Sequence, residues 1–560
     1  MKSCSIANSE YFWGSPACFN QIYIRTKEMY MRRKKKSTLP KWGLLAVLVV
    51  ILAGAAIGYA KLRSGDGTSA SAPETPAGSA PVSSHSPAAA SPAPTKTPIP
   101  SETVDVAIIG SELEGMYLAR AAADEGLRVK VIDPRAKAGG QLIQGEMLFL
   151  DETRDASGKL LVQGRAKELF DGFRAGRIRK LGEFQTYYAK LTNGIPMESG
   201  ITIQEVAAAP GIQGTEAVQS VIYKTADGSE KKLTASYWVE NSDFAALASR
   251  LKVTRLPGLE KFYGQDQIEY MSAGMMMKFK NVDWARFQAA YKESVNESFA
   301  IGLTGVTRGY KPTNDSVFLR GLNAVSQRDG EVIINAFLIY QVDPSDDASI
   351  AAAKELGQKE IPLILQYFKK NMTGWENAEL NGFPDYLYIR EYNHYETDYV
   401  LKVSDVLGAR MFPDNVSIAG YPLDLQGLKA NKWGIEMGRP DKYGMPLRSF
   451  QLKNYENVLM AGKNVGTTAI AYGSARIQPN TSLAAESIGV ILGQIQGKKK
   501  LRELTESDWS TLHPYLESKY NIKVTGVTGT NKIAGWTAEE IAKLDTGAII
   551  YPSYVKTRKP

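Results

Sequence analysis

Residues 104–133 read VDVAIIGSELEGMYLARAAADEGLRVKVID, and this stretch decides the fold class. Its first six residues are apolar apart from Asp105, which is typical of a buried parallel strand. A turn bounded by Gly110 and Gly115 follows, then a helical apolar pattern, then a second strand that ends at Asp133. Strand, helix and strand within about 30 residues predict a β-α-β unit of an α/β domain.

The turn of this unit has the features of a dinucleotide site. Gly110 permits the sharp turn and Gly115 permits close packing of helix on strand, so that the amides at Ser111 and beyond face a pyrophosphate. Asp133 lies 18 residues after Gly115, where an acidic side chain binds an adenosine ribose. Glu112 departs from the G-x-G-x-x-G pattern, because its carboxylate would crowd and repel the pyrophosphate. A β-α-β unit that binds no ligand is the alternative.

The next residues favour FAD over a nicotinamide cofactor. The segment 133–140 reads DPRAKAGG, with a glycine pair seven residues after the acid. It is similar to the second motif of the glutathione-reductase-type FAD fold, in which Arg-x-Gly-Gly follows the acid. This likeness implies a further set of cofactor-binding residues: Pro134, Arg135, Gly139, Gly140 and Gln141.

Later segments resemble the bacterial FAD-dependent oxidoreductase family. The motifs are Tyr388-Ile-Arg390-Glu391, Gly420-Tyr-Pro-Leu-Asp424 and Asn457-Val-Leu-Met-Ala-Gly462-Lys463, followed by Gly473-Ser474-Ala-Arg476. The resemblance covers residues 103–495 and implies that a strand at 457–461, a Gly/Ser-bearing loop and a helix from about residue 481 close over the flavin. The cofactor-binding residues that it implies here are Gly462, Lys463, Asn464, Gly473, Ser474 and Arg476.

The same resemblance points to catalytic candidates. His394 is the only histidine in the resembling region and lies close behind Arg390 and Glu391. His394 would act as an acid or base beside the flavin or contact the substrate, and a packed structural histidine is the alternative. Arg390 would either bind a substrate carboxylate or form an ion pair that orients Glu391.

The domain organisation follows from these blocks. We expect a Rossmann-like FAD-binding domain of the glutathione-reductase type, with an inserted α+β substrate domain. Strands at 275–284 and 331–342 and a helix at 349–371 are expected in the insertion, and helices at 506–520 and 537–544 near the C-terminus. The predicted parts are the FAD domain at 103–250 and 381–497, the substrate domain at 251–380 and an accessory segment at 498–560.

The N-terminal segment predicts a membrane anchor. Residues 42–60 contain no charged side chain and are long enough for one transmembrane helix, preceded by a basic cytoplasmic stretch at 1–41. Residues 61–102 are rich in Pro, Ser and Ala, which predicts a disordered linker. The positive-inside rule then places the enzyme body outside the cytoplasm. A cleaved signal peptide is the alternative.

Charge and cysteine usage exclude several function classes. The net charge is +8, but residues 1–63 carry 11 Lys and Arg against two Glu, so the rest of the chain is close to neutral and predicts no nucleic-acid partner. The cysteines are Cys4 and Cys18, so no disulfide, thiolate nucleophile or cysteine metal site is expected in the folded part.

Together these features predict a membrane-anchored, extracytoplasmic FAD-dependent oxidoreductase. It would take a hydride from a small organic substrate and pass the electrons to an acceptor that the sequence does not identify. The alternative is a non-catalytic surface protein that keeps a flavoprotein fold and binds a ligand. Glu112 and the altered turn near Asn241 favour that alternative, whereas the intact glycines and Asp133 favour the enzyme.

Overall fold

The computed structural model describes residues 98–558, and residues 99–560 form one compact unit. The predicted transmembrane helix and most of the predicted linker lie outside the described residues. Within the described part of the chain, no helix is both long enough and apolar enough to cross a bilayer.

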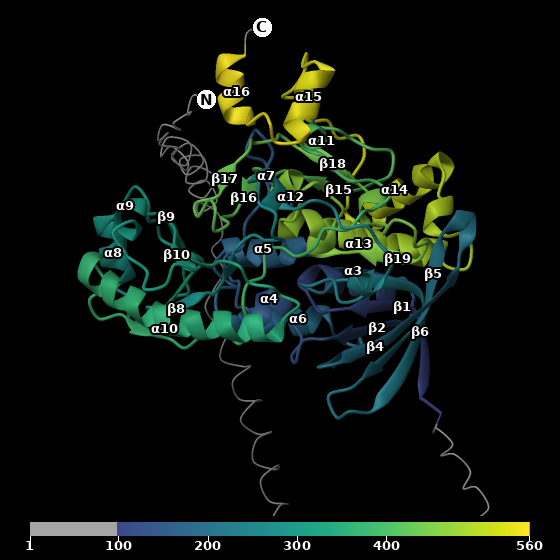
Figure 1. Ribbon diagram of the computed structural model, residues 1–560, viewed down its shortest axis with the longest axis horizontal. Coiled ribbons are helices and arrows are strands. Elements are labelled where there is room, and N and C mark those ends of the chain that lie inside the picture. The colour runs from purple at the N-terminus through teal and green to yellow at the C-terminus, as the bar shows by residue number, and fades with distance from the viewer. Residues whose placement is uncertain (1–97, 559–560) are drawn as a thin grey trace, which may run out of the picture. The chain divides into compact units, whose positions relative to one another are not determined.

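The largest sheet of the unit is a seven-stranded mixed sheet, which lies on the lower right in Figure 1. Its parallel part contains the predicted β-α-β unit, and its order is β3, β2, β1, β6 and β19. The strands are β1 (Ser101–Ile109), β2 (Val129–Asp133), β3 (Met197–Ser199), β4 (Thr202–Pro210), β5 (Glu216–Lys224), β6 (Glu230–Glu240) and β19 (Val458–Met460).

Strand β6 has two different partners on the side opposite β1. Its first half pairs antiparallel with β5, which in turn pairs with β4, and its last residues pair parallel with β19. The carboxyl ends of β1, β6 and β19 therefore meet at one edge of the sheet. Ligands of open α/β sheets bind at such an edge.

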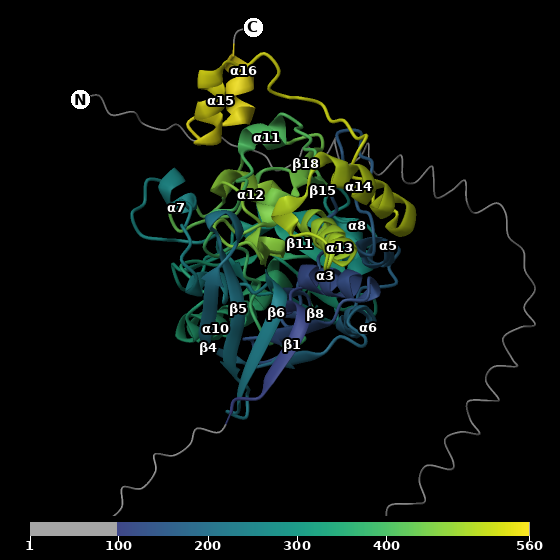
Figure 2. The same cartoon turned by 90° about the vertical axis from the view of Figure 1, so that its right-hand side faces the viewer.

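Two helices pack together beside this edge, α3 (Leu113–Asp124) and α13 (Gln478–Ile495) (Figure 2). Small residues let the two helices approach closely, because a Cβ at Gly489 would lie 2.5 Å from the carbonyl oxygen of Leu118. The first turn of α13 is thereby held next to the glycine turn that precedes α3, although the two lie more than 360 residues apart in the chain.

Residues 273–389 contribute a separate hydrophobic core. It is built on two small sheets and one long helix, α10 (Asp347–Asn371). The first sheet has the order β10 (Val317–Leu319), β13 (Phe337–Ile339) and β7 (Ala273–Gly274). The second has the order β14 (Glu379–Leu380), β8 (Met277–Lys280), β12 (Val332–Ile334), β11 (Leu322–Ser326) and β9 (Phe299–Gly302).

The structure differs from the sequence prediction in three places. The strand expected at 275–284 is limited to Met277–Lys280, and a helix begins at Trp284. The expected strand at 331–342 is broken at Asn335 and Ala336, where the chain leaves one small sheet and enters the other. The expected Gly/Ser loop after β19 contains a helix, α12 (Ala469–Ala475), and α13 begins three residues earlier than predicted. The side chain of Thr468 caps α12 by accepting from Ala471 N, which explains why this glycine-bearing stretch is helical.

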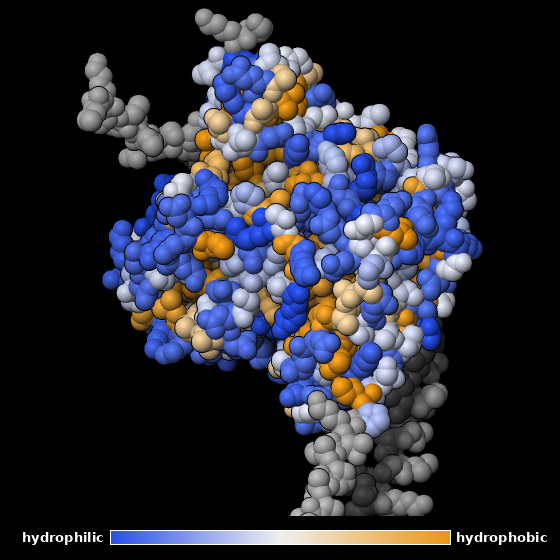
Figure 3. Space-filling model, turned by 45° about the vertical axis from the view of Figure 1, so that its right-hand side comes forward, coloured by the Kyte–Doolittle hydropathy of each residue, from blue (hydrophilic) through white to orange (hydrophobic). Residues whose placement is uncertain are grey.

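The other predicted helices are present, including α14 (Glu506–Tyr520) and α15 (Ala538–Asp545). Polar residues predominate on the face in Figure 3, and apolar residues reach the surface in small groups. The remaining helices of four or more residues are α4 (Gly140–Ile143), α5 (Ala166–Arg174), α6 (Leu181–Leu191), α7 (Leu259–Phe262), α8 (Trp284–Ala290), α9 (Thr304–Thr307), α11 (Val403–Leu407), η3 (Leu447–Phe450) and α16 (Tyr551–Thr557). The remaining strands are β15 (Asn415–Ala419), β16 (Asp424–Leu425), β17 (Ile435–Glu436) and β18 (Tyr443–Pro446).

Candidate functional site

The glycine turn after β1 is fixed by a side chain from the end of β6. Gly110 has a φ of +93°, and a Cβ there would lie 2.6 Å from the backbone of Ser242. The buried side chain of Asn241 accepts from Gly115 N at 3.0 Å and donates to Glu112 O at 2.9 Å. Asn241 therefore holds the turn and the first residues of α3 in register with the neighbouring strand.

Asp133 closes the other side of the turn. One of its carboxylate oxygens accepts from the amide and the hydroxyl of Ser111, and the other accepts from Arg135 N at 2.8 Å. Burial raises the pKa of Asp133 to about 7, although these hydrogen bonds oppose the rise. The predicted ribose-binding acid thus lies at the carboxyl end of β2, directly behind the turn, and Pro134 follows it half-buried.

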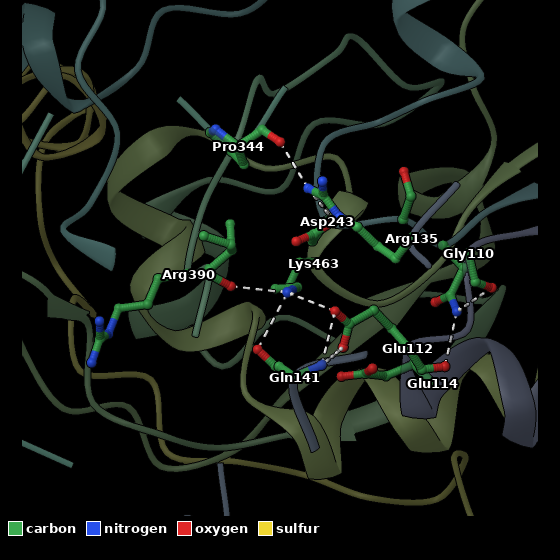
Figure 4. Close-up of polar contacts among 12 residues, drawn as sticks. Gly110, Glu112, Glu114, Arg135, Gln141, Asp243, Pro344, Arg390 and Lys463 are labelled. Atoms are coloured by element: carbon green, nitrogen blue, oxygen red, sulfur yellow. Dashed lines mark hydrogen bonds and ion pairs between the residues drawn. The ribbon is translucent and has the colours of Figure 1, made fainter. Parts of the chain in front are cut away.

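Glu112 points into the cradle that the turn creates (Figure 4). Its carboxylate oxygens accept from Gln141 N at 3.1 and 3.2 Å, and Lys463 Nζ lies 3.3 Å from Oε1. A Cβ at Gly140, whose φ is +49°, would lie 2.5 Å from the Glu112 carboxyl carbon. Gly139 is held by a hydrogen bond from its amide to the Ser111 hydroxyl. The carboxylate thus occupies the anion position between the N-terminal ends of α3 and α4.

Lys463 links this cradle to the second half of the chain. Besides Glu112, its ammonium contacts the side-chain oxygen of Gln141 at 3.2 Å and the carbonyl of Ile389 at 2.9 Å (Figure 4). Its neighbour Gly462 has a φ of +60°, and Asn464 donates to Ser242 O at 3.0 Å. The turn after β19 is therefore bonded to the turn after β6.

Arg135 is predicted to bind the cofactor, and its charge is satisfied within the chain. Its guanidinium lies 3.1 Å from Asp243 Oδ1 and donates to Pro344 O at 2.7 Å (Figure 4). It also stacks on the rings of Phe244 and Tyr386, at 4.3 and 4.7 Å from their centroids. Arg135 thereby connects the cradle to the residues just before α10.

Carboxylates outnumber cations around the cradle. Burial is the main cause that raises the pKa of Glu112 and brings that of Glu114 to about 7. Asp133 and Asp243 add to the negative field, and the nearby cations are Lys463 and Arg135. Like charges at this distance disfavour ionisation. The carboxylates of the cradle can therefore accept a further anion nearby when one of them takes up a proton.

The structure brings together two of the three predicted catalytic residues. His394 Nε2 lies 2.7 Å from Glu391 Oε1, and the second oxygen of Glu391 accepts from Met271 N at 2.6 Å. Both side chains are buried, and the His394 ring packs edge-on against Tyr472. Arg390 donates to Ser272 O and Asn335 Oδ1 instead of forming an ion pair with Glu391, so of the two roles expected for Arg390 the one that orients Glu391 is not observed.

The remaining predicted residues lie outside the cradle. Gly473 permits close packing of α12 on β16, because a Cβ there would lie 2.9 Å from Asp424 N. Ser474 donates to Tyr421 O at 2.7 Å and is 2.8 Å from the Tyr443 hydroxyl. Arg476 is buried beside Asp424 and belongs to a group of arginines described below.

Sequence reasoning missed several residues of the site. Asn241 was read as part of an altered turn, whereas it organises that turn. Glu114 is fully buried, with one oxygen accepting from Thr481 and the other without a partner. An acidic residue in the first turn of a largely apolar helix is a signal in the sequence that points to Glu114. No motif in the sequence around Arg320 points to a functional role. Its position near the site results from the way the chain folds.

The residues present fit a dinucleotide cofactor. A diphosphate requires amide and ammonium donors, and Gln141 N and Lys463 Nζ provide them where Glu112 now binds. Among the described residues, buried polar atoms without a hydrogen-bond partner occur on the elements around the cradle, as expected where a polar ligand completes the hydrogen bonding. These atoms are Glu114 Oε2, Asp243 Oδ2, Gln478 Nε2 and Ser482 Oγ. In residues 98–558, no group of three or more His, Cys, Asp or Glu is placed to hold a metal ion.

The family that the chain matches agrees with a dinucleotide site. Residues 105–509 match the family described as FAD dependent oxidoreductase. Similar solved structures include a geranylgeranyl bacteriochlorophyll reductase-like protein from Thermoplasma acidophilum, at 11% identity and a TM-score of 0.33, covering 82% of this chain and 98% of that one. Another is p-nitrophenol 4-monooxygenase from Pseudomonas putida, at 11% identity and a TM-score of 0.35, covering 80% and 94%. No curated protein matches the chain.

Proposed function

Because the chain belongs to the FAD dependent oxidoreductase family and is a flavoenzyme, we propose that it removes a hydride from a small organic substrate and passes the electrons on to a separate acceptor. This proposal rests on one observation: the backbone segment that bears the buried pair His394 and Glu391 is bonded to the diphosphate cradle. Lys463 bonds to both the cradle and the carbonyl of Ile389, which is two residues before Glu391. This contact supports a position of His394 and Glu391 close to the bound cofactor.

The residues that would hold the cofactor come from four turns. Asp133 would accept from the ribose, and Gln141 N with Lys463 would hold the diphosphate after Glu112 has moved aside. The start of α13 would lie near the flavin, because α13 packs on α3 beside the cradle. We assign the fold to the glutathione-reductase type, supported by the parallel core with β4, β5 and β6 beside it.

FAD, when bound, supplies the acceptor for the hydride, and the chain supplies proton handling and orientation. A carboxylate oxygen only accepts, so the hydrogen bond to Glu391 puts the proton of His394 on Nε2. Nδ1 is then the basic nitrogen, able to take a proton from a substrate hydroxyl or amine as the hydride departs. Burial of both side chains keeps water from competing for that proton.

We further propose that the enzyme body is held outside the cytoplasm by the apolar segment at residues 42–60. The support is the sequence, with six Lys and Arg at residues 32–41 directly before the segment and two directly after it. Protease added to intact cells should remove the C-terminal body and leave a short membrane-bound fragment. Protection of the body in intact cells would refute this orientation, and recovery of the whole chain in the soluble fraction would refute the anchor.

The visible absorption spectrum of the purified protein tests the cofactor and the reaction class. We expect the two bands of oxidised flavin, release of FAD on heating, and bleaching under anaerobic conditions by a true substrate. A colourless protein that takes up no FAD on soaking would contradict the proposal and favour the non-catalytic alternative. Bleaching by a nicotinamide dinucleotide alone would identify a reductase and refute hydride removal from an organic substrate.

A further inference from the structure

Three buried arginines from distant parts of the chain lie together near the His394–Glu391 pair. Arg320 connects β10 to β11, Arg390 follows β14 in the chain, and Arg476 ends α12. Their exposed fractions are 9%, 3% and 7%. Burial, and to a lesser extent the neighbouring charges of Arg320 and Arg476, lower the pKa of Arg390 to about 10. We refer to Arg320, Arg390 and Arg476 as the arginine cluster.

The cluster contains less negative charge than positive charge. Asp424 Oδ2 lies 3.8 Å from Arg476 and accepts from the amide of Gln426, whose oxygen accepts from Arg320. The carboxyl group of Asp151 also lies near Arg320 and Arg476; it bonds to the Tyr421 hydroxyl, and burial raises its pKa to about 6. Glu391 is turned toward His394 and Met271 N.

Arg390 is bonded to neutral groups. It donates to Ser272 O at 2.8 Å and to Asn335 Oδ1 at 3.0 Å, and it lies 4.2 Å from the centre of the Tyr388 ring. Asn335 stands at the break between the two small sheets, so the fold itself presents this amide to the arginine. A buried cation without a carboxylate costs several kcal/mol, and a bound anion would offset that cost.

Unpartnered polar atoms occur within the same cluster. Arg476 Nε and Asp424 Oδ1 are buried and have no hydrogen-bond partner in the described part of the chain, and Ser272 Oγ is in the same state. Arg476 is more than nine-tenths buried. A guanidinium with a free Nε–H beside a second guanidinium is the donor arrangement that binds a carboxylate with two hydrogen bonds.

The cluster is also connected to the proposed acid–base pair. The Tyr472 hydroxyl donates to Arg390 O at 2.9 Å, and the Tyr472 ring centre lies 4.4 Å from that of His394. In Figure 4 the guanidinium of Arg390 points away from the contacts between Lys463 and Glu112. A group bound by the cluster would therefore leave the diphosphate cradle open.

We propose that the arginine cluster binds the carboxylate of the substrate, so that the enzyme acts on a small organic acid. This inference rests on the proposed function, since it names the substrate class for the same site. A carboxylate fits better than a phosphate, because Asp424 already balances one cation and the remaining excess is small. The carboxylate would anchor the substrate while its reacting carbon lies toward His394.

The test is calorimetric titration of the full-length protein with benzoate, acetate and inorganic phosphate, and with benzamide as the neutral match for benzoate. We expect benzoate to bind at least tenfold more tightly than benzamide and phosphate, and R390M to weaken benzoate binding at least tenfold. R390K should recover part of the loss. D424N should tighten benzoate binding severalfold, because it removes a competing charge, and a gain of affinity cannot result from misfolding.

R179M is the matched control. Arg179 is as buried as Arg390, stacks on Phe173 and Phe299 and has a pKa that burial likewise lowers to about 10, but it lies outside the cluster. R179M should leave benzoate affinity within twofold. Equal loss in R179M and R390M, tighter binding of phosphate, or equal binding of benzamide would overturn the proposal.

The titrations are run with FAD bound and after its removal, so that the two proposals fail separately. A protein that binds no FAD but still binds benzoate through Arg390 would refute the proposed function and leave the anion site standing. A yellow, FAD-loaded protein that binds benzoate and benzamide equally would refute the anion site but would not contradict the proposed flavoenzyme function.

Discussion

Replacement of Glu112 by Gln should strengthen FAD binding. The Glu112 carboxylate accepts from Gln141 N and lies 3.3 Å from Lys463 Nζ, and these are the donors that the diphosphate of the cofactor requires. Glutamine has the same shape without the charge. E112Q therefore removes an internal competitor for the cradle and leaves its backbone in place.

The magnitude follows from two opposing contributions. A carboxylate and a phosphate charge about 4 Å apart repel each other by about 4 kcal/mol at the effective dielectric constant of a protein site. The wild-type protein avoids part of this cost by protonating Glu112, whose pKa burial already raises, or by turning the side chain away. We therefore expect E112Q to gain about 1.4 to 3 kcal/mol, or about 10- to 100-fold in affinity.

The assay is calorimetric titration of the apoprotein with FAD between pH 6 and 8. Wild-type affinity should fall as pH rises, because a deprotonated Glu112 repels the diphosphate, and E112Q should show a weaker dependence. E486Q is the control, because Glu486 is also buried with a raised pKa but bonds to Arg165 away from the cradle. Its FAD affinity should match that of the wild type. Weaker FAD binding by E112Q would show that the carboxylate assists the cofactor and would refute this reasoning.

Three further predictions concern stability and catalysis. In the apoprotein, burial raises the pKa of Glu114 from 4.5 to about 7, so the folded state binds more protons than the unfolded state in this range and stability falls as pH rises through it. Urea unfolding should show this loss, up to about 3 kcal/mol between pH 4.5 and 7.5 for this group, and an unchanged pH profile in E114Q would contradict it. N241A should lower the free energy of unfolding by about 1 to 3 kcal/mol, because it leaves Gly115 N buried without its partner and removes one of the two hydrogen bonds to Glu112 O. Urea unfolding against the exposed-site control N193A measures this, and a loss below about 0.5 kcal/mol would contradict the role of Asn241. H394Q should retain FAD but slow its anaerobic reduction by substrate by about 10²- to 10⁴-fold in stopped-flow measurements, whereas an unchanged rate would mean that His394 is structural.

The β-α-β unit could be predicted because its signals are local. Apolar runs identify buried strands, and Gly110 is needed where the backbone turns with a positive φ. The helices at 347–371 and 506–520 were also predictable, since their apolar spacing and flanking polar residues are read within a few turns. By contrast, the helix α12 was missed because its cap, Thr468, stands in a stretch whose glycine and serine suggested a loop.

The candidate site was predicted only in part. A motif can indicate where a strand ends. The strands β1, β2 and β19 end at one edge of the sheet, which explains why Asp133, Gly140 and Lys463 lie there. The direction in which each side chain of a motif points cannot be read from the motif, because it depends on contacts with distant parts of the chain. Arg390 and Glu391 are neighbours in sequence, yet they face different partners because alternate residues of an extended segment point to opposite sides.

The sequence by itself determined the fold class, the cofactor family and the positions of the glycine turns, because each is read from short motifs whose residues are close neighbours in the chain. Only the tertiary structure decided that Glu112 fills the anion position, that Asn241 holds the turn, and that Arg320 and Arg476 join Arg390. These contacts join residues up to 351 positions apart, as Glu112 and Lys463 are. Their energies depend on burial and on the distance between charges, and neither quantity exists until the sheets and helices have packed.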